Sequence, residues 1–224
     1  MHESTSNLPQ AIFFDLDGTL LDSLPGIAFS IEQAFLACDL PMQPIDLRQT
    51  IGPPIGKILA LASPQATQDE LVLLERAFRV SYDSEGWQKT PIFPGSDAML
   101  QEARVLGIQL FVVSNKPRHI STRILEREGL LSLFLEVVTR DSREPVYASK
   151  AHMIEHLLHA FKLEPARCVM VGDTTEDAHA AATMQVSFAW VAHGYGELSP
   201  SQTIAHRIHS FSELLPMLTK EFAQ

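Results

Sequence analysis

The stretch that decides the fold is AIFFDLDGTLLDS, residues 11–23, in which an apolar run leads directly into two carboxylates, Asp15 and Asp17. The run AIFF is typical of a short buried strand. Two acids so close together repel each other, and nothing in the run before them could neutralise them. A strand followed by an ordinary polar turn would give the same pattern, since Asp-Gly is a good turn dipeptide. The rest of the chain has to decide between a turn and a functional site.

Four further runs of the chain have the near-continuous apolar character of strands buried on both faces of a parallel sheet. They are residues 108–114, 134–139, 167–173 and 187–196. Helical patterns lie between them, at 96–107 (opening at a Ser or Asp cap), 149–163 and 174–184. Because strands and helices alternate, the sequence predicts an α/β fold, a doubly wound (Rossmann-like) parallel sheet.

Residues 22–91 break this alternation, because they contain apolar residues at helical spacing and no strand-like run. The helical periods are Ile27, Ile31, Phe35 and Cys38, then Ile58, Leu59 and Leu61, then Leu71, Leu74 and Phe78. The last period opens with a capping box, TQDE, at Thr67–Glu70. We therefore expect an α/β core made of residues 1–21 and 92–224, with an all-helical cap domain, residues 22–91, inserted after the first strand.

The composition excludes several classes of partner. The chain has 224 residues and a formal net charge of −10, without a basic run of the kind that nucleic acid requires. Its apolar runs are far shorter than the roughly 20 residues that cross a bilayer, and the N-terminus lacks a secretory signal. The two cysteines, Cys38 and Cys168, sit in apolar patterns typical of buried free thiols. These features favour a cytoplasmic protein, as a monomer or homodimer, without a nucleic-acid or membrane partner.

Polar side chains follow three of the expected strands, and ligands of open α/β sheets bind outside these strand ends. They are Asp15 and Asp17, Ser114 and Asn115, and Asp173 with Asp177. Several carboxylates at one site need a cation, and oxygen ligands alone select a hard ion, so Mg²⁺ is favoured over Zn²⁺. Mg²⁺ commonly takes one or two carboxylates plus a substrate phosphate, which makes the site a candidate clamp for a phosphoryl group.

The sequence also indicates which of these carboxylates would act in catalysis. The chain has no G-x-x-x-x-G-K-[ST] loop, so the phosphate is not expected to be held as in a nucleoside triphosphatase. A carboxylate can act as a nucleophile and form an aspartyl phosphate, while a second acid protonates the leaving group and later activates water. Asp15 and Asp17 fit these two roles.

Three segments, DLDGTLLDS, VVSNKP and VGDTTEDAHAA, together resemble motifs I, II and IV of the haloacid dehalogenase superfamily, specifically its phosphoglycolate-phosphatase-like group with a helical cap. The resemblance implies Asp15 as nucleophile, Asp17 as general acid/base and Ser114 with Asn115 as phosphate-binding residues. It also implies Mg²⁺ as cofactor, with Asp173 as a ligand and Asp177 supporting it, so that the candidate metal residues are Asp15, Asp17, Asp173 and Asp177. The substrate implied is a small phosphate monoester.

Motif III departs from the resemblance, because the group's P-K-P-x-P is replaced here by SREPVYASKAHMI. We expect Lys150 to be the phosphate-binding lysine, with Lys116 as the substitute candidate and Arg143 as a further one. In the cap, IGPPIGKI (51–58) is either a simple linker or a rigid loop facing the site. In the second case Lys57 or Arg48 would bind a second anionic group of the substrate.

The leading functional hypothesis is a Mg²⁺-dependent phosphatase acting on phosphoglycolate, a nucleotide or a sugar phosphate. The alternative is a phosphomutase of the β-phosphoglucomutase type, which passes the phosphoryl group to a sugar and not to water. A dehalogenase needs neither Mg²⁺ nor an acid at Asp17, and a silent binding protein usually lacks a catalytic acid, so the complete set of carboxylates argues against both.

Overall fold

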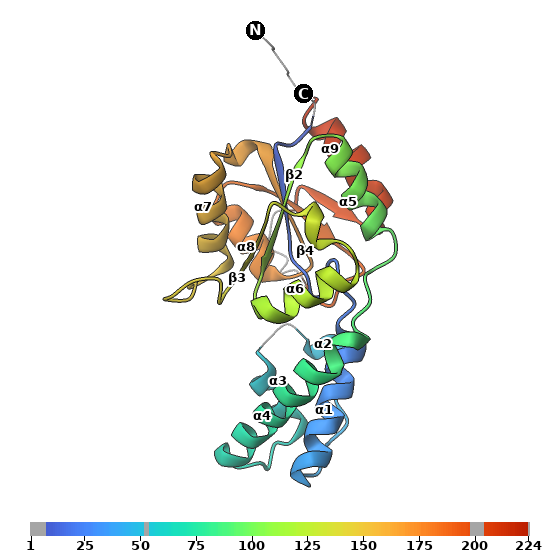
Figure 1. Cartoon of the computed structure of the whole chain (residues 1–224), viewed down its shortest axis with the longest axis vertical. Helices are drawn as coiled ribbons and strands as arrows, with labels where there is room; N and C mark the ends of the chain where they lie inside the picture. Colours follow the sequence, from blue (N-terminus) through green and yellow to red (C-terminus); the bar gives the residue numbers. More distant parts are fainter. Residues whose placement is uncertain (1–7, 52–53, 198–203, 224) are drawn as a thin grey trace. The chain divides into compact units, whose positions relative to one another are not determined.

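The computed structural model describes residues 8–51, 54–197 and 204–223, and the chain divides into two compact units (Figure 1). One unit combines the chain up to Leu21 with the chain from Ile92 onward, and the other is Asp22–Pro91. The first unit holds the sheet, and the second is helical. Among the described residues, no helix combines the length and the apolar character needed to cross a membrane.

The sheet has six parallel strands in the order β3-β2-β1-β4-β5-β6. They are β1 (Ala11–Phe14), β2 (Gln109–Ser114), β3 (Glu136–Thr139), β4 (Cys168–Gly172), β5 (Ser187–Val191) and β6 (His206–Ile208). The chain runs outward from β1 to β3 and then returns to β4 on the other side of β1. This is the doubly wound parallel sheet that the sequence predicts.

Helices alternate with these strands and cover the sheet (Figure 1). They are α5 (Ser96–Val105), α6 (Arg118–Arg127), α7 (Lys150–Phe161), α8 (Thr175–Thr183) and α9 (Leu214–Glu221), with short 3₁₀ turns at η2 (Leu131–Leu133), η3 (Pro165–Arg167) and η4 (Phe211–Glu213). The helix α7 packs beside α8, and α5 contacts α9.

The central strand β1 is apolar on both faces, because successive side chains of a strand point to opposite sides of the sheet. Phe13 packs against Phe111, with ring centroids 5.7 Å apart, in a cluster that also contains Leu157 of α7. Ile12 and Phe14 point to the other face, and every residue of β1 is 0% exposed. Full burial of each such side chain stabilises the fold by about 1.5–3 kcal/mol. The strand that carries Asp15 is therefore held rigidly from both sides.

The helical unit consists of α1 (Leu24–Cys38), α2 (Leu47–Thr50), α3 (Ile55–Ala62), α4 (Gln68–Ser84) and the 3₁₀ turn η1 (Gly86–Lys89). Apolar residues at helical spacing form its core, where Phe78 stacks on Tyr82 with ring centroids 5.5 Å apart. The capping box of α4 is confirmed, because Thr67 accepts from the backbone N–H of Glu70 and the Glu70 carboxylate accepts from Thr67.

Several local predictions are wrong. The predicted strand 187–196 ends at Val191, and the residues after it turn back toward the end of β4. The helix α5 has Gly95 at its N-cap position, with φ +80°, in place of a Ser or Asp cap. Leu61 is 58% exposed, although its spacing places it with the buried residues of α3.

The two cysteines differ in their surroundings. Cys168 is fully buried, and burial raises the pKa of its thiol to about 12. Cys38 is only half-buried, so the prediction of two buried thiols holds for one of them.

Candidate active site

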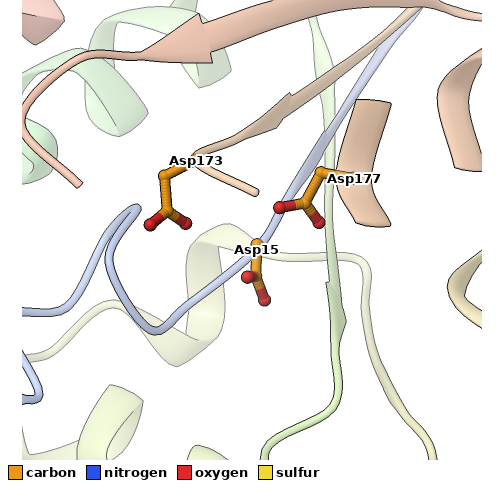
Figure 2. A group of neighbouring side chains, drawn as sticks. All are labelled: Asp15, Asp173 and Asp177. Carbon is orange, nitrogen blue, oxygen red and sulfur yellow. The ribbon is translucent and has the colours of Figure 1, made fainter. Parts of the chain in front are cut away.

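Three aspartates meet at the carboxyl edge of the sheet (Figure 2). Asp15 follows β1, Asp173 follows β4, and Asp177 lies on the first turn of α8. One carboxylate oxygen of each lies within 4.8 Å of one oxygen of each other residue, and all three side chains are buried. The sheet order explains the convergence, because β1 and β4 are adjacent and parallel and so end at the same edge.

Lys150, the first residue of α7, lies among these carboxylates. Its Nζ is 2.8 Å from Oδ2 of Asp15 and 2.6 Å from Oδ1 of Asp177. Burial disfavours the charged ammonium, but the attraction of Asp15 and Asp177 outweighs burial and raises the pKa of Lys150 above its ordinary value. Lys150 is therefore a fixed positive charge beside Asp15.

The single ammonium group of Lys150 does not balance the negative charge of the three carboxylates. Burial, partly offset by Lys150 and reinforced by Asp177, raises the pKa of Asp15 from 3.8 to about 7. Burial and the neighbouring Asp177 raise the pKa of Asp173 to about 6. Oδ1 of Asp15 is also buried without a hydrogen-bond partner among the described residues. Three carboxylates with one ammonium group leave two negative charges, and oxygen donors of this kind fit a hard divalent cation such as Mg²⁺.

Asp173 is held by groups from two loops. The hydroxyl of Thr19 donates to its Oδ1 at 3.1 Å, and the backbone N–H groups of Tyr195 and Gly196 donate to Oδ2 at 2.8 and 3.1 Å. Gly18 lies so close that a Cβ there would approach Oδ2 of Asp173 to 2.2 Å, and its φ is +80°. Sequence reasoning missed Thr19, although its place in the run DGT two residues after Asp17 could have identified it.

Asp177 also caps the helix on which it lies. Its Oδ2 accepts from the backbone N–H and the hydroxyl of Thr174, at 3.0 and 2.6 Å, and its own N–H donates to Oγ1 of Thr174. Gly172 leaves the space that Asp177 fills, since a Cβ there would lie 2.5 Å from its Cγ. The capping box directs the other oxygen, Oδ1, toward Lys150.

Asp17 lies apart from the three-aspartate cluster. Its Oδ1 contacts Nζ of Lys116 at 2.8 Å, and its side chain is 29% exposed. Of the four carboxylates expected at the metal, the structure thus gathers Asp15, Asp173 and Asp177, while Asp17 is paired with a lysine.

The remaining candidates are distributed more widely. Ser114 ends β2 and is buried, whereas Asn115 is exposed and donates from Nδ2 to Glu176 at 2.8 Å. Arg143 stacks on the ring of Tyr147, 4.1 Å from its centroid. Arg48 and Lys57 belong to the helical unit, on α2 and α3, and both are exposed. Part of the segment 51–58 lies outside the described residues.

Comparison with known proteins gives one family. A family model described as haloacid dehalogenase-like hydrolase matches residues 12–191. Tyrosine-protein kinase PtkA of Mycobacterium tuberculosis (strain ATCC 25618 / H37Rv) is 32% identical over 194 residues, which are 86% of this chain and only 65% of PtkA. The phosphoglycolate phosphatase of Pasteurella multocida (strain Pm70) is 32% identical over 193 residues, covering 82% of this chain and 86% of that enzyme.

Solved structures agree with this result. A structure described as a predicted phosphoglycolate phosphatase from Haemophilus somnus 129pt superposes with a TM-score of 0.84 at 26% identity, covering 96% of this chain and 99% of that one. The fold, the acidic strand ends and the family model lead to the same conclusion: the chain belongs to the haloacid dehalogenase-like hydrolases.

Proposed function

We propose that this protein is a Mg²⁺-dependent phosphatase that hydrolyses a small phosphate monoester through a phosphorylated Asp15. The observation that carries the proposal is the environment of Asp15. Its buried Oδ1 lacks a hydrogen-bond partner among the described residues, while Lys150 lies 2.8 Å from its other oxygen. A lone pair that is not engaged in a hydrogen bond, beside a fixed positive charge, is what attack on a phosphoryl group requires. The relatives named phosphoglycolate phosphatase support a substrate of this size, such as phosphoglycolate, a nucleotide or a sugar phosphate.

In the first half of the proposed reaction, Oδ1 of Asp15 forms a bond to phosphorus as the ester P–O bond breaks. Asp17, protonated at that moment, donates its proton to the departing alkoxide. Lys150, whose Nζ lies 2.8 Å from Oδ2 of Asp15, would stabilise the negative charge on the phosphoryl oxygens, and the hydroxyl of Ser114 at the end of β2 would assist it. Asp15, Asp173 and Asp177 would hold Mg²⁺, which when bound neutralises charge on the nucleophile and the phosphoryl group.

In the second half, Asp17 takes a proton from water, and the water oxygen attacks the phosphorus of the acyl phosphate. The P–O bond to Asp15 breaks, inorganic phosphate leaves, and Asp15 is again a carboxylate. Asp17 finishes the cycle protonated, ready for the next ester. The two acids of the DLD segment differ in exposure as these roles require: Asp15 is buried beside Lys150, and the side chain of Asp17, beside Lys116, is 29% exposed.

The test is phosphate release from a panel of metabolite monoesters and an aryl phosphate, with Mg²⁺, after chelation and with Ca²⁺. We expect release with Mg²⁺, loss after chelation and inhibition by Ca²⁺, whose larger and looser coordination shell misplaces the nucleophile. Mass spectrometry of acid-quenched protein should find phosphate on the peptide that contains Asp15. Full activity after exhaustive chelation, or an adduct on Ser114 instead, would overturn the mechanism.

A phosphotransferase is the second candidate, because the similar protein PtkA is named a tyrosine-protein kinase. In this case the phosphoryl group on Asp15 would pass to a hydroxyl and not to water, as it would in a phosphomutase. Product analysis separates these outcomes: free phosphate in amounts equal to the alcohol released supports hydrolysis, whereas a phosphorylated sugar or tyrosine with less free phosphate supports transfer.

A further inference from the structure

Lys116 places a second buried ammonium group at the carboxyl edge of the sheet. Its side chain is 4% exposed, and its Nζ lies 2.8 Å from Oδ1 of Asp17. The two residues lie in the loops that follow the adjacent parallel strands β1 and β2. We propose that Lys116 is a positioning residue, which holds the Asp17 side chain away from the metal cluster and directs it at the leaving group, as proton donor in the first half of the reaction and as proton acceptor in the second. The inference rests on the proposed function and assigns the Lys116 ammonium to Asp17 and not to the phosphate.

The backbones on both sides of this ion pair are fixed. The N–H of Lys116 donates to Oγ of Ser114 at 3.3 Å, and the hydroxyl of Ser121 donates to the carbonyl of Lys116 at 3.4 Å. Directly after Asp17, the N–H of Gly18 donates to the carbonyl of Leu21 at 2.9 Å. Because both main chains are held, the ion pair contributes directly to the orientation of the Asp17 side chain.

The two buried lysines contact different carboxylates. Lys150 contacts Asp15 and Asp177, while Lys116 contacts Asp17. A divalent cation attracts every carboxylate within reach, and a carboxylate that already has a buried counter-charge is harder to recruit. Removing the Lys116 ammonium would therefore weaken the hold on the Asp17 side chain and favour its movement toward the cation.

The competing role for Lys116 is direct phosphate binding. Geometry favours Lys150 for that role, since its Nζ lies 2.8 Å from Oδ2 of Asp15, the residue whose other oxygen, Oδ1, would become attached to the phosphoryl group. The two roles predict different changes in the kinetic parameters of a Lys116 variant. Loss of a phosphate ligand raises KM and weakens inhibition by inorganic phosphate, whereas loss of a positioning residue lowers kcat in proportion to how much the leaving group needs its proton.

The experiment compares Lys116→Met with wild type on aryl phosphates whose leaving groups span a wide range of pKa. For the poorest leaving groups we expect kcat to fall about tenfold or more, against about twofold or less for the best ones. KM and the inhibition constant of inorganic phosphate should stay within about twofold. Lys116→Arg should recover part of the loss, and Lys220→Met, an equal change of charge at an exposed lysine of α9, should behave as wild type.

A double-mutant cycle with Asp17→Asn completes the test. Because Lys116 acts through Asp17, adding Lys116→Met to Asp17→Asn should lower kcat no further. Three results would each overturn the inference while leaving the phosphatase activity standing. The first is an equal fall in kcat for all leaving groups. The others are a double variant whose fall in kcat equals the product of the two single falls, and a raised inhibition constant for phosphate. If wild type released no phosphate from any aryl ester, the proposed function would fall as well. Should the Met variant unfold, Lys116→Gln carries the same comparison.

Discussion

Among single residues, Asp15 shows a conflict between activity and stability. We expect Asp15→Asn to abolish phosphate release and yet to melt at a higher temperature than wild type in chelator at pH 8. The folded-state pKa of Asp15 is raised from 3.8 to about 7, so its stabilising contribution is fully present below pH 3.8 and is lost as pH rises through about 7. The asparagine never carries the buried charge, and the gain should be on the order of a few kcal/mol at pH 8.

The measurement is thermal unfolding in chelator at pH 5 and pH 8. The advantage of Asp15→Asn should shrink at pH 5, where the wild-type carboxyl is largely protonated. Asp39→Asn serves as the matched control, because Asp39 is an exposed carboxyl at the left-handed C-cap of α1, a conformation that asparagine tolerates. An asparagine variant no more stable than wild type at pH 8 would mean that Lys150 already compensates the charge of Asp15.

Among secondary-structure elements, the N-terminus of α8 joins a helix cap to a candidate metal ligand. Thr174→Ala removes a hydroxyl that donates to Asp177 at 2.6 Å and accepts from its N–H, so it should cost about 0.5–2 kcal/mol of stability. It should also weaken Mg²⁺ binding roughly tenfold, because the capping box orients the Asp177 carboxylate. Thr174→Ser should restore both. Calorimetric titration of Mg²⁺ and chemical denaturation measure the two effects.

The chain contains its own control for this prediction. Thr67 forms the same capping box at the start of α4, in the helical unit. Thr67→Ala should therefore cost a similar amount of stability and leave Mg²⁺ affinity unchanged. If both alanine variants weakened Mg²⁺ binding equally, the effect of Thr174 would be a general loss of stability and not the orientation of Asp177.

The elements also show where sequence is informative. The strands β1, β2 and β4 are identifiable because strands buried on both faces need continuous apolar runs, and their ends locate Asp15, Ser114 and Asp173. Among the helices and strands of the described residues, four lie outside the predicted set: α2, α6, β6 and α9. The helix α6 buries little beyond Ile120, Ile124 and Leu125 in an otherwise polar sequence, and β6 has three residues, so neither gives a periodic signal long enough to recognise.

Within the site, sequence predicts which residues gather at the edge of the sheet better than it predicts how they pair. The sequence favours Lys150 over Lys116 as the phosphate-binding lysine without deciding between them, because spacing fixes where a backbone lies and leaves a long side chain able to reach several partners. The structure separates them: Lys150 contacts Asp15, and Lys116 contacts Asp17. The support that Thr19 gives Asp173 spans 154 positions of the chain, and only the folded sheet shows it.

At the scale of the whole molecule, the chain forms two compact units. We propose that the sheet unit carries the catalytic residues and that the helical unit determines substrate specificity. We expect Lys57→Ala or Arg48→Ala to change the ranking of metabolite esters, because an exposed cation can bind a second anionic group that an aryl phosphate lacks. Turnover of the aryl phosphate should stay within about twofold of wild type. Steady-state kinetics on both kinds of substrate test this. An equal fall for both would place the residue in the chemistry or the fold instead.

The strand order also has a consequence for biosynthesis. A ribosome releases β1 early, but one of its two neighbours, β4, lies 157 residues later, as the pairing of Ala11 with Cys168 shows. The whole helical unit, Asp22–Pro91, emerges in the interval and can become compact first. Nascent chains shorter than about 170 residues would therefore carry Asp15 without its metal-binding partners. Pulsed hydrogen exchange on stalled chains should find amides of α1 and α4 protected before those of β1, so that the candidate active site forms only after the helical unit has become compact.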